Sequence, residues 1–391
     1  MDVESLLSQV DIERLYKHIL SLHYERDPVF SPDLLLKARD YVTKELQTYG
    51  VTTSTHSFKI PGSDVVYDNV VGQLGSGEPE MLITSHYDHV RDVPGADDNL
   101  SAVAVMLEVA RILAEAGVDK RIGFVSFNLE EQNPVLSRSL HEKGVQLGLW
   151  GEDGIPLLYH TAKLLKVYQK SLSHYRNSKL SYEISCEKAF DAHKGSMNAE
   201  EAEYFSYMVE RTKDVQSRNP AGFFGINGSA HYVESLREKG HQVKGMINLE
   251  TIGFSSDKPN SQVFPEKLNI HQFPSYKVED ITTGDFIVIC SDNNSLELGQ
   301  SFFKACQHPA VELPAVFLAI PFGFEEIKTE IPDLLRADHA PFWKAQIPAL
   351  MITDSADFRN PYYHTPGDRI ETLDFEFMRK ITQASLLSSL S

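Results

Sequence analysis

The stretch "SHYDHVRDVPGADDNLSA", from Ser85 to Ala102, decides the fold class because it joins a predicted strand to a predicted helix. The run "EMLIT" before it is typical of a strand that is buried on both faces. The following "NLSAVAVMLEVARILAEAG" has the apolar spacing of a helix, with Asn99 as the expected N-cap and Gly117 as the stop. Two histidines and four aspartates crowd the junction. The stretch therefore predicts a strand-to-helix connection that carries ligand-type side chains.

The neighbouring segments continue this alternation of strands and helices. The helix is followed by the buried strand "RIGFVSFNLEE", residues 121–131, and the resulting β-α-β order indicates a parallel α/β core. Further strands are expected at 56–60, 69–75, 241–253, 285–291 and 347–355, and helices within 11–49 and at 228–240, 295–306 and 373–390.

The pattern breaks between residues 133 and 220, which are polar, rich in tyrosine and helical in parts. Helices are expected at 155–172 and 198–217, the second with Asn198 and Glu201 as a capping box. We therefore expect one catalytic domain made of residues 1–132 and 221–391, with 133–220 as an insertion. It begins just after the carboxyl end of a strand, where ligands bind in open α/β sheets. A lid or a subunit contact is the favoured role, and a structural layer without catalytic role is the alternative.

Composition narrows the partners and the compartment. The 391 residues carry a net charge of −18, which disfavours nucleic acids and anionic membranes as partners. The amino terminus lacks the basic and apolar regions of a secretion signal, and no apolar run approaches about 18 residues. Cys186, Cys290 and Cys306 are far apart and are expected to be reduced, buried thiols. We expect a cytoplasmic protein.

Four more clusters of polar side chains follow apolar runs, as the first cluster does. They contain Glu130 and Glu131; Glu250; Asp338 and His339; and Asp357, His364 and Asp368. Because the carboxyl ends of parallel strands meet at one edge of a sheet, these groups are expected to converge. Each cluster alone is weak: a histidine near an aspartate is usually a surface pair, and paired glutamates are usually a solvated loop. All five together indicate a site.

The chemistry that this set suits is metal-assisted hydrolysis. Zinc binds histidine nitrogen and carboxylate oxygen at roughly 2.0–2.2 Å, and two ions roughly 3.5–4 Å apart need a bridging carboxylate. The spacing of His86 and Asp88 places both side chains on one face of a strand, so Asp88 can hold the imidazole by its far nitrogen. The adjacent Glu130 and Glu131 can divide the roles of ligand and general base.

These motifs, in this order, resemble the co-catalytic di-zinc aminopeptidases of metallopeptidase family 28. The matching stretches are "SHYDHV…PGADDNLSAVAVMLEVARIL", "FNLEE", "GSAHYVESL…GMINLETIGF", "ADHAPFW" and "YYHTPGD", within residues 30–132 and 221–385. The resemblance implies a three-layer α/β/α fold of the phosphorylase/hydrolase-like kind. Its mostly parallel mixed sheet would have about eight strands between helical layers.

The resemblance also implies roles for individual residues. One zinc ion would be bound by His86 and Glu250, the other by Glu131 and His364, and Asp98 would bridge both, with Asp97 as a neighbour only. The Asp98–Asn99 peptide is expected to be cis, as the family often shows. Glu130 would be the general base and Asp88 would orient His86.

The implied activity is hydrolysis of an amide bond by a hydroxide between the two ions, removing amino-terminal residues from small peptides. The sequence departs from the family in Glu250, where many members have Asp, and in Leu129, often Gly. It lacks the Tyr that some members place ahead of the Asp-His motif to stabilise the oxyanion. Arg336, His339 or Tyr363 could substitute.

Several alternatives stay open. Glutaminyl cyclases share the implied fold and usually hold one zinc, and a deacylase or pathway-specific amidohydrolase could use the same site. Cobalt or manganese suits these ligand types as well. A non-enzymatic scaffold is disfavoured by the complete ligand set. The expected partners are a small peptide or amide substrate and, through the insertion, further copies of the chain as a homo-oligomer.

Overall fold

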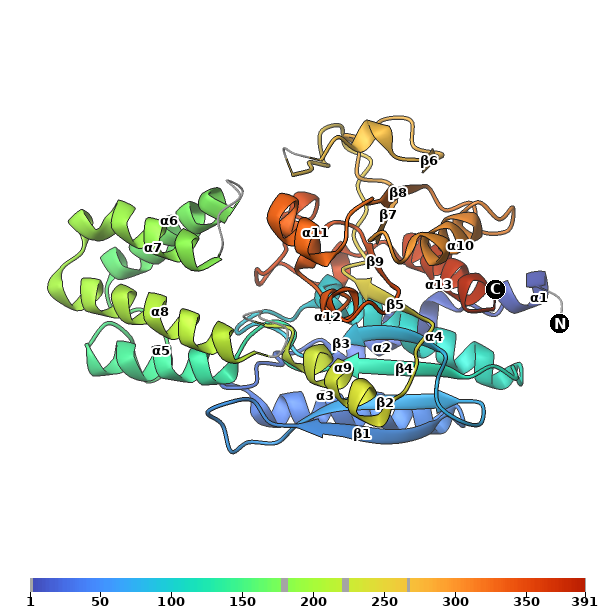
Figure 1. Ribbon diagram of the computed structural model, residues 1–391, viewed down its shortest axis with the longest axis horizontal. Helices are drawn as coiled ribbons and strands as arrows, with labels where there is room; N and C mark the ends of the chain where they lie inside the picture. The colour runs from blue at the N-terminus through green and yellow to red at the C-terminus, as the bar shows by residue number, and fades with distance from the viewer. Residues whose placement is uncertain (1–2, 177–181, 220–224, 266–267, 391) are drawn as a thin grey trace.

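The structure is a computed structural model that describes residues 3–176, 182–219, 225–265 and 268–390 (Figure 1). Its strands are β1 (Thr52–Phe58), β2 (Tyr67–Leu74), β3 (Met81–His86), β4 (Ile122–Phe127), β5 (Gly245–Glu250), β6 (Ser275–Tyr276), β7 (Ile287–Ser291), β8 (Ala315–Ala319) and β9 (Ala349–Thr353). Its α-helices are α1 (Val3–Leu7), α2 (Ile12–Leu22), α3 (Pro32–Thr48), α4 (Ala102–Glu115), α5 (Pro134–Gln146), α6 (Tyr159–Arg176), α7 (Tyr182–His193), α8 (Ala199–Arg218), α9 (Asn227–Lys239), α10 (Leu296–Cys306), α11 (Phe324–Glu330), α12 (Ala340–Lys344) and α13 (Phe375–Leu390).

The strands form one mixed sheet in the order β1-β2-β4-β3-β5-β9-β7-β8-β6. The middle strands β4, β3, β5 and β9 run parallel to one another, as do β7 and β8. Antiparallel pairs join β1 to β2, β2 to β4, β9 to β7 and β8 to β6. The parallel middle of the sheet brings the carboxyl ends of four strands to one edge, where the predicted site residues lie.

Helices cover both faces of the sheet, which confirms the expected three layers. One apolar cluster joins α1–α4, α10 and α13 to one face, and the other joins α9, α11 and α12 to the opposite face. Successive strand residues enter opposite clusters, as Leu82 and Ile83 of β3 and Met246 and Ile247 of β5 do. This alternation explains why these strands read as continuous apolar runs.

Helices α5–α8 fall within the predicted insertion and pack around their own apolar cluster, which includes Tyr168, Tyr204 and Phe205. Figure 1 shows them extending from one end of the longest axis, opposite the chain termini. The predicted capping box of Asn198 and Glu201 is present at the start of α8. The division of the chain into 1–132 with 221–391 and an insertion at 133–220, and the role of that insertion, stay predictions.

One local expectation was wrong: Asn99 does not cap α4. A wide helical turn spans Ala96–Ser101, kinked at Asp98 and Asn99, and α4 follows it. The Asn99 side chain instead donates to the carbonyl oxygen of Leu249 at 3.0 Å and accepts from the N–H of Thr251 at 3.1 Å. It is therefore used to tie this turn to the end of β5.

Two expectations from composition can be compared with the structure. Cys186, Cys290 and Cys306 are all free and buried. Among the residues that the structure describes, no helix has the length and apolar content needed to cross a membrane.

Candidate metal centre

The predicted ligands converge at the carboxyl edge of the parallel strands. His86 ends β3, Glu250 ends β5, Glu130 and Glu131 follow β4, Asp98 lies in the turn before α4, and His364 lies between β9 and α13. Backbone conformation helps to aim them, because Leu129, Thr251 and His364 have φ values of 57°, 44° and 53°. Such left-handed backbone is uncommon outside glycine and is often found at functional sites.

Asp98 lies between two sets of donors. Its Oδ1 is 3.3 Å from His86 Nε2, which is also 3.2 Å from Glu250 Oε1. Its Oδ2 is 3.1 Å from His364 Nε2, which is also 3.1 Å from Glu131 Oε2. Each oxygen of the Asp98 carboxylate therefore faces a different histidine, and each histidine also faces a different glutamate, which is the arrangement expected of a bridging ligand.

These donors suit metal ions. Separations of 3.1–3.3 Å are those of neighbouring donors arranged tetrahedrally about an ion at roughly 2.0–2.1 Å. Asp98 Oδ1 is buried and has no hydrogen-bond partner in the described part of the chain. A buried carboxylate oxygen without a partner is costly, and a cation would satisfy it.

The electrostatics of the cluster favour positive charge. Burial lowers the pKa of His364, but the carboxylates of Glu131 and Asp98 outweigh it and raise that pKa to about 10. Burial likewise lowers the pKa of His86, but the Glu250 carboxylate outweighs burial and raises this pKa well above the ordinary value. Burial would raise the pKa of Asp98, yet the imidazoles of His364 and His86 hold it well below the ordinary value. The site therefore stabilises cations between its carboxylates.

The two adjacent glutamates are in different states. Burial raises the pKa of Glu130 well above its ordinary value, and the neighbouring carboxylates of Glu250 and Glu131 add to the rise. Burial and Asp98 would also raise the pKa of Glu131, but the imidazoles of His364 and His89 lower it to about 2. Glu131 is thus the carboxylate held as an anion, whereas Glu130 retains affinity for a proton.

Asp88 acts differently from the expectation. His86 Nδ1 lies 3.2 Å from the main-chain carbonyl oxygen of Asp88 and 3.7 Å from its carboxylate, so the carbonyl orients the ring. The carboxylate accepts the N–H groups of Glu130 and Glu131 at 3.1 and 3.2 Å. Asp88 therefore holds the turn that carries both glutamates.

The segment that follows the predicted insertion holds the other side of this turn. The N–H of Ile226 donates to the Glu130 carbonyl oxygen at 2.7 Å, and that of Asn227 donates to the Leu129 carbonyl oxygen at 2.9 Å. The Asn227 side chain also accepts from Asn219 at 2.9 Å. The chain that leaves the turn into α5 thus returns to the same turn after α8.

Asp97 is kept away from the cluster. Its two oxygens accept from the N–H of Gly253 and from the Asn360 side chain, each at 2.7 Å. The Asp368 carboxylate accepts the N–H groups of Asp97 and Asp98 at 2.8 and 3.1 Å. The peptide that follows Asp98 is cis, as expected. Asp98 is the member of this acidic pair that faces the histidines.

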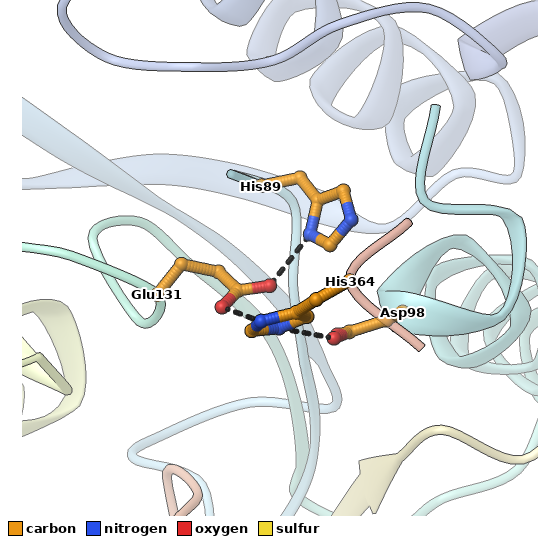
Figure 2. A group of neighbouring side chains, drawn as sticks. All are labelled: His89, Asp98, Glu131 and His364. Atoms are coloured by element: carbon orange, nitrogen blue, oxygen red, sulfur yellow. Dashed lines mark hydrogen bonds and ion pairs between the residues drawn. The ribbon is translucent and has the colours of Figure 1, made fainter. Parts of the chain in front are cut away.

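The structure adds His89, to which the sequence reasoning gave no role. Figure 2 shows its ring beside Glu131, with its Nδ1 2.5 Å from Glu131 Oε1. His89, Asp98, Glu131 and His364 each offer a ligand-type atom within 4.8 Å of the others. The signal was present, since His89 follows His86 by three residues, but strand periodicity says nothing about a loop residue.

Arg26 is a second residue that sequence reasoning missed. It is 0% exposed, and its guanidinium donates to the carbonyl oxygens of Tyr87, Pro94 and Gly95 at 2.9, 2.6 and 3.2 Å. It therefore holds both ends of the loop that presents His89. A single arginine far away in the sequence carries no recognisable signal.

The three residues predicted as candidates for substrate contact lie in different environments. Tyr363 stacks on the His364 ring at 3.9 Å between centroids, and its hydroxyl lies 3.5 Å from Arg336 Nη2. Arg336 also donates to Asp357 at 3.0 Å. His339 is 0% exposed, lies 2.7 Å from the Leu334 carbonyl oxygen through Nε2 and packs on Trp343. The structure brings Tyr363 and Arg336 to the metal centre but gives His339 a core environment.

A cavity of about 80 Å³ opens beside Glu250 and Tyr363. Arg336, Asp333 and Asp357 also line it. Its apolar wall includes Phe264, Leu268, Val288, Cys290, Leu318 and Met351. It is an apolar pocket with a polar rim that includes one candidate ligand, Glu250, as small-molecule sites commonly are.

The sequence of this chain is similar to those of known proteins. The model of peptidase family M28 matches residues 69–152 and 315–388. The uncharacterized protein YfbL of Escherichia coli is 24% identical over 358 residues, covering 89% of this chain and 78% of YfbL. Aminopeptidase YwaD of Bacillus subtilis is 51% identical over 51 residues, which is 13% of this chain and 11% of YwaD.

Solved structures share the fold. The Legionella pneumophila LapA aminopeptidase has a TM-score of 0.58 at 15% identity, covering 99% of this chain and 73% of LapA. BSAP, a zinc aminopeptidase from Bacillus subtilis, has 0.55 at 14%, covering 97% and 94%. Macrostomum lignano glutaminyl cyclase has 0.55 at 14%, covering 99% and 90%.

The three-layer fold and the buried carboxylate and imidazole cluster define a metal-dependent hydrolase of the peptidase class. The match to the model of peptidase family M28 covers parts of both halves of this chain, so the chain is similar to that family.

Proposed function

We propose that this protein is a zinc-dependent aminopeptidase that removes amino-terminal residues from small peptides with a pair of metal ions. The carrying observation is Asp98, whose two oxygens each lie within 3.3 Å of a different histidine, and each of these histidines lies within 3.2 Å of a different glutamate. One ion would be held by His86 and Glu250, and the other by Glu131 and His364, with Asp98 common to both. The likeness to zinc and aminopeptidase structures supports this choice.

When bound, the ions would supply an acidified water and polarise the scissile carbonyl. The remaining steps belong to side chains of the chain. Glu130 takes the proton of the attacking water and returns it to the leaving nitrogen, for which its raised pKa is suited. The Tyr363 hydroxyl donates to the substrate carbonyl oxygen as this oxygen gains negative charge. Arg336, whose Nη2 lies 3.5 Å from the Tyr363 hydroxyl, favours that charge.

The general test is a panel of aminoacyl-anilides, N-acylated amino acids and peptides with amino-terminal glutamine, assayed with and without a chelator. The proposal expects hydrolysis of the aminoacyl-anilides that the chelator abolishes and zinc restores. Ring closure of glutamine peptides with one tightly bound zinc would favour the cyclase alternative, which the likeness to a glutaminyl cyclase keeps open. Turnover of N-acylated amino acids alone would indicate a deacylase.

The apolar pocket beside Glu250 supports a more specific substrate. Its volume of about 80 Å³ is below the roughly 150 Å³ of a cavity that admits benzene, so it suits an aliphatic side chain. A peptide with leucine, methionine or valine at its amino terminus would place the side chain of that residue in the pocket and its scissile bond beside the candidate metal ligands.

Filling the pocket should therefore change selectivity. In Val288→Phe the larger ring occupies the space of the substrate side chain, so kcat/KM for leucine anilide should fall about 10–100-fold. Alanine anilide needs less of the pocket and should change by less than about threefold. Steady-state kinetics on both anilides measures the ratio.

The matched control is Val316→Phe. Val316 lies in the same apolar cluster as Val288 but does not line the pocket. It should lower the melting temperature as overpacking does while leaving the ratio of the two substrates unchanged. If Val288→Phe lowered both substrates in parallel, the pocket would not be the specificity site.

A further inference from the structure

Two adjacent glutamates follow β4, and something must decide which one becomes the metal ligand. Asp88 holds the main-chain N–H groups of both Glu130 and Glu131 and so does not distinguish them. Both carboxylates are nearly buried, at 7% and 5% exposure of the side chain. The difference must come from the groups that contact the carboxylates themselves.

His89 contacts one of the two. Its Nδ1 lies 2.5 Å from Glu131 Oε1, while Glu131 Oε2 faces His364 Nε2 at 3.1 Å (Figure 2). Within the described residues, the ion-pair partner of the Glu130 carboxylate is His86 Nε2 at 3.9 Å, which is beyond hydrogen-bond distance. The His89 contact is a direct one within hydrogen-bond reach, and the separation of 3.1 Å is also compatible with two donors bound to one ion.

The environment of His89 fixes its ring. The side chain is 0% exposed, and its main-chain N–H donates to the Arg26 carbonyl oxygen at 3.2 Å. A Cβ at Gly95 would lie 2.4 Å from His89 Cδ2, so a side chain there would displace the ring. His89 Nε2 has no hydrogen-bond partner in the described part of the chain, so Nδ1 is the ring nitrogen that has an acceptor for its N–H.

From these contacts we infer that His89 is a positioning residue that selects Glu131 as a metal ligand. Its Nδ1–H donates to Glu131 Oε1 and turns Oε2 toward the second ion, the one held with His364 and Asp98. Among the described residues Glu130 has no such partner, and it is left to move a proton. The inference rests on the proposed function in one respect, the presence of a second ion.

The test compares two variants of similar size. The amide nitrogen of His89→Asn occupies the place of Nδ1 and can donate to Glu131, whereas His89→Leu cannot. Purified chain is stripped with a chelator and titrated with Zn²⁺ by calorimetry and with Co²⁺ by visible absorption. The second ion should bind about 10–100-fold more weakly to His89→Leu, and within about threefold of the wild type to His89→Asn. The first ion should be unchanged in both.

A double-mutant cycle with Glu131→Gln checks that His89 acts through Glu131. His89→Leu should have no further effect on the second ion when Glu131 is already changed. Equal loss in His89→Asn and His89→Leu, an effect confined to the first ion, or no effect in either variant would each overturn the inference.

Metal binding separates this result from the proposed activity. If the wild type binds two ions and the His89 variants do not differ, the inference on His89 fails while the function stands. If the wild type binds two ions and His89→Leu loses one, but no anilide is cleaved, the inference holds and the aminopeptidase proposal fails. A wild type that binds a single ion overturns both the two-ion site and the role of His89.

Discussion

Asp98→Ala should lose at least one of the two metal ions and reduce amide hydrolysis roughly a thousandfold or more. Asp98 lies between His86 and His364, and each of its oxygens is within 3.3 Å of one of them. Removing it takes a ligand from both ions and leaves the other buried carboxylates and imidazoles poorly matched in charge. Elemental analysis of the purified variant and the anilide assay measure the two effects.

The control for this substitution is Asp119→Ala, which removes an exposed aspartate after α4. It should keep the metal content and the activity of the wild type. Full metal occupancy in Asp98→Ala would show that another group bridges the ions. The proposed arrangement of ligands would then have to be abandoned.

Glu130→Gln should keep both ions and lose about 10²–10⁴ in kcat, because only the proton carrier is removed. The adjacent Glu131→Gln is a matched comparison, since the same chemical change one residue later should weaken binding of the second ion. The main-chain N–H groups of Glu130 and Glu131 both donate to the Asp88 carboxylate, and neither substitution changes these hydrogen bonds. Their difference therefore reports on the carboxylates and not on the turn.

Metal content and kcat, measured on the two variants side by side, decide the outcome. Retained turnover in Glu130→Gln would contradict its role as the general base. Loss of metal in Glu130→Gln with retention in Glu131→Gln would exchange the two roles. Excess zinc in the assay should rescue part of the activity of Glu131→Gln and none of that of Glu130→Gln.

Local patterns in the sequence were sufficient for a parallel α/β core, whereas the three-layer arrangement was implied by the family resemblance. Strands buried on both faces, such as β3 and β4, read as apolar runs, and α4 shows helical spacing that Gly117 ends. The short strands β6 and β8 and the short helix α11 were not predicted. With two, five and seven residues, they offer too little periodicity.

Side-chain identity at the strand ends predicted that the polar clusters converge, and the family resemblance chose the five residues among them. His86, Asp98, Glu131, Glu250 and His364 lie within 3.3 Å of at least one other member of this set. The prediction for the hydrogen-bond partners of one side chain, that of Asn99, was wrong. Asn99 was expected to cap a helix and instead ties the turn before α4 to the end of β5, because its partners, Leu249 and Thr251, are distant in sequence.

The sequence by itself determined the order of strands and helices and the presence of carboxylates and imidazoles at the strand ends, since both depend on neighbours along the chain. Tertiary structure alone decided how these groups divide their tasks. Asp88 uses its carbonyl for His86 and its carboxylate for the glutamate turn, and His89 contacts Glu131 and not Glu130. Such choices depend on distances of a few tenths of an ångström between loops, which no local pattern encodes.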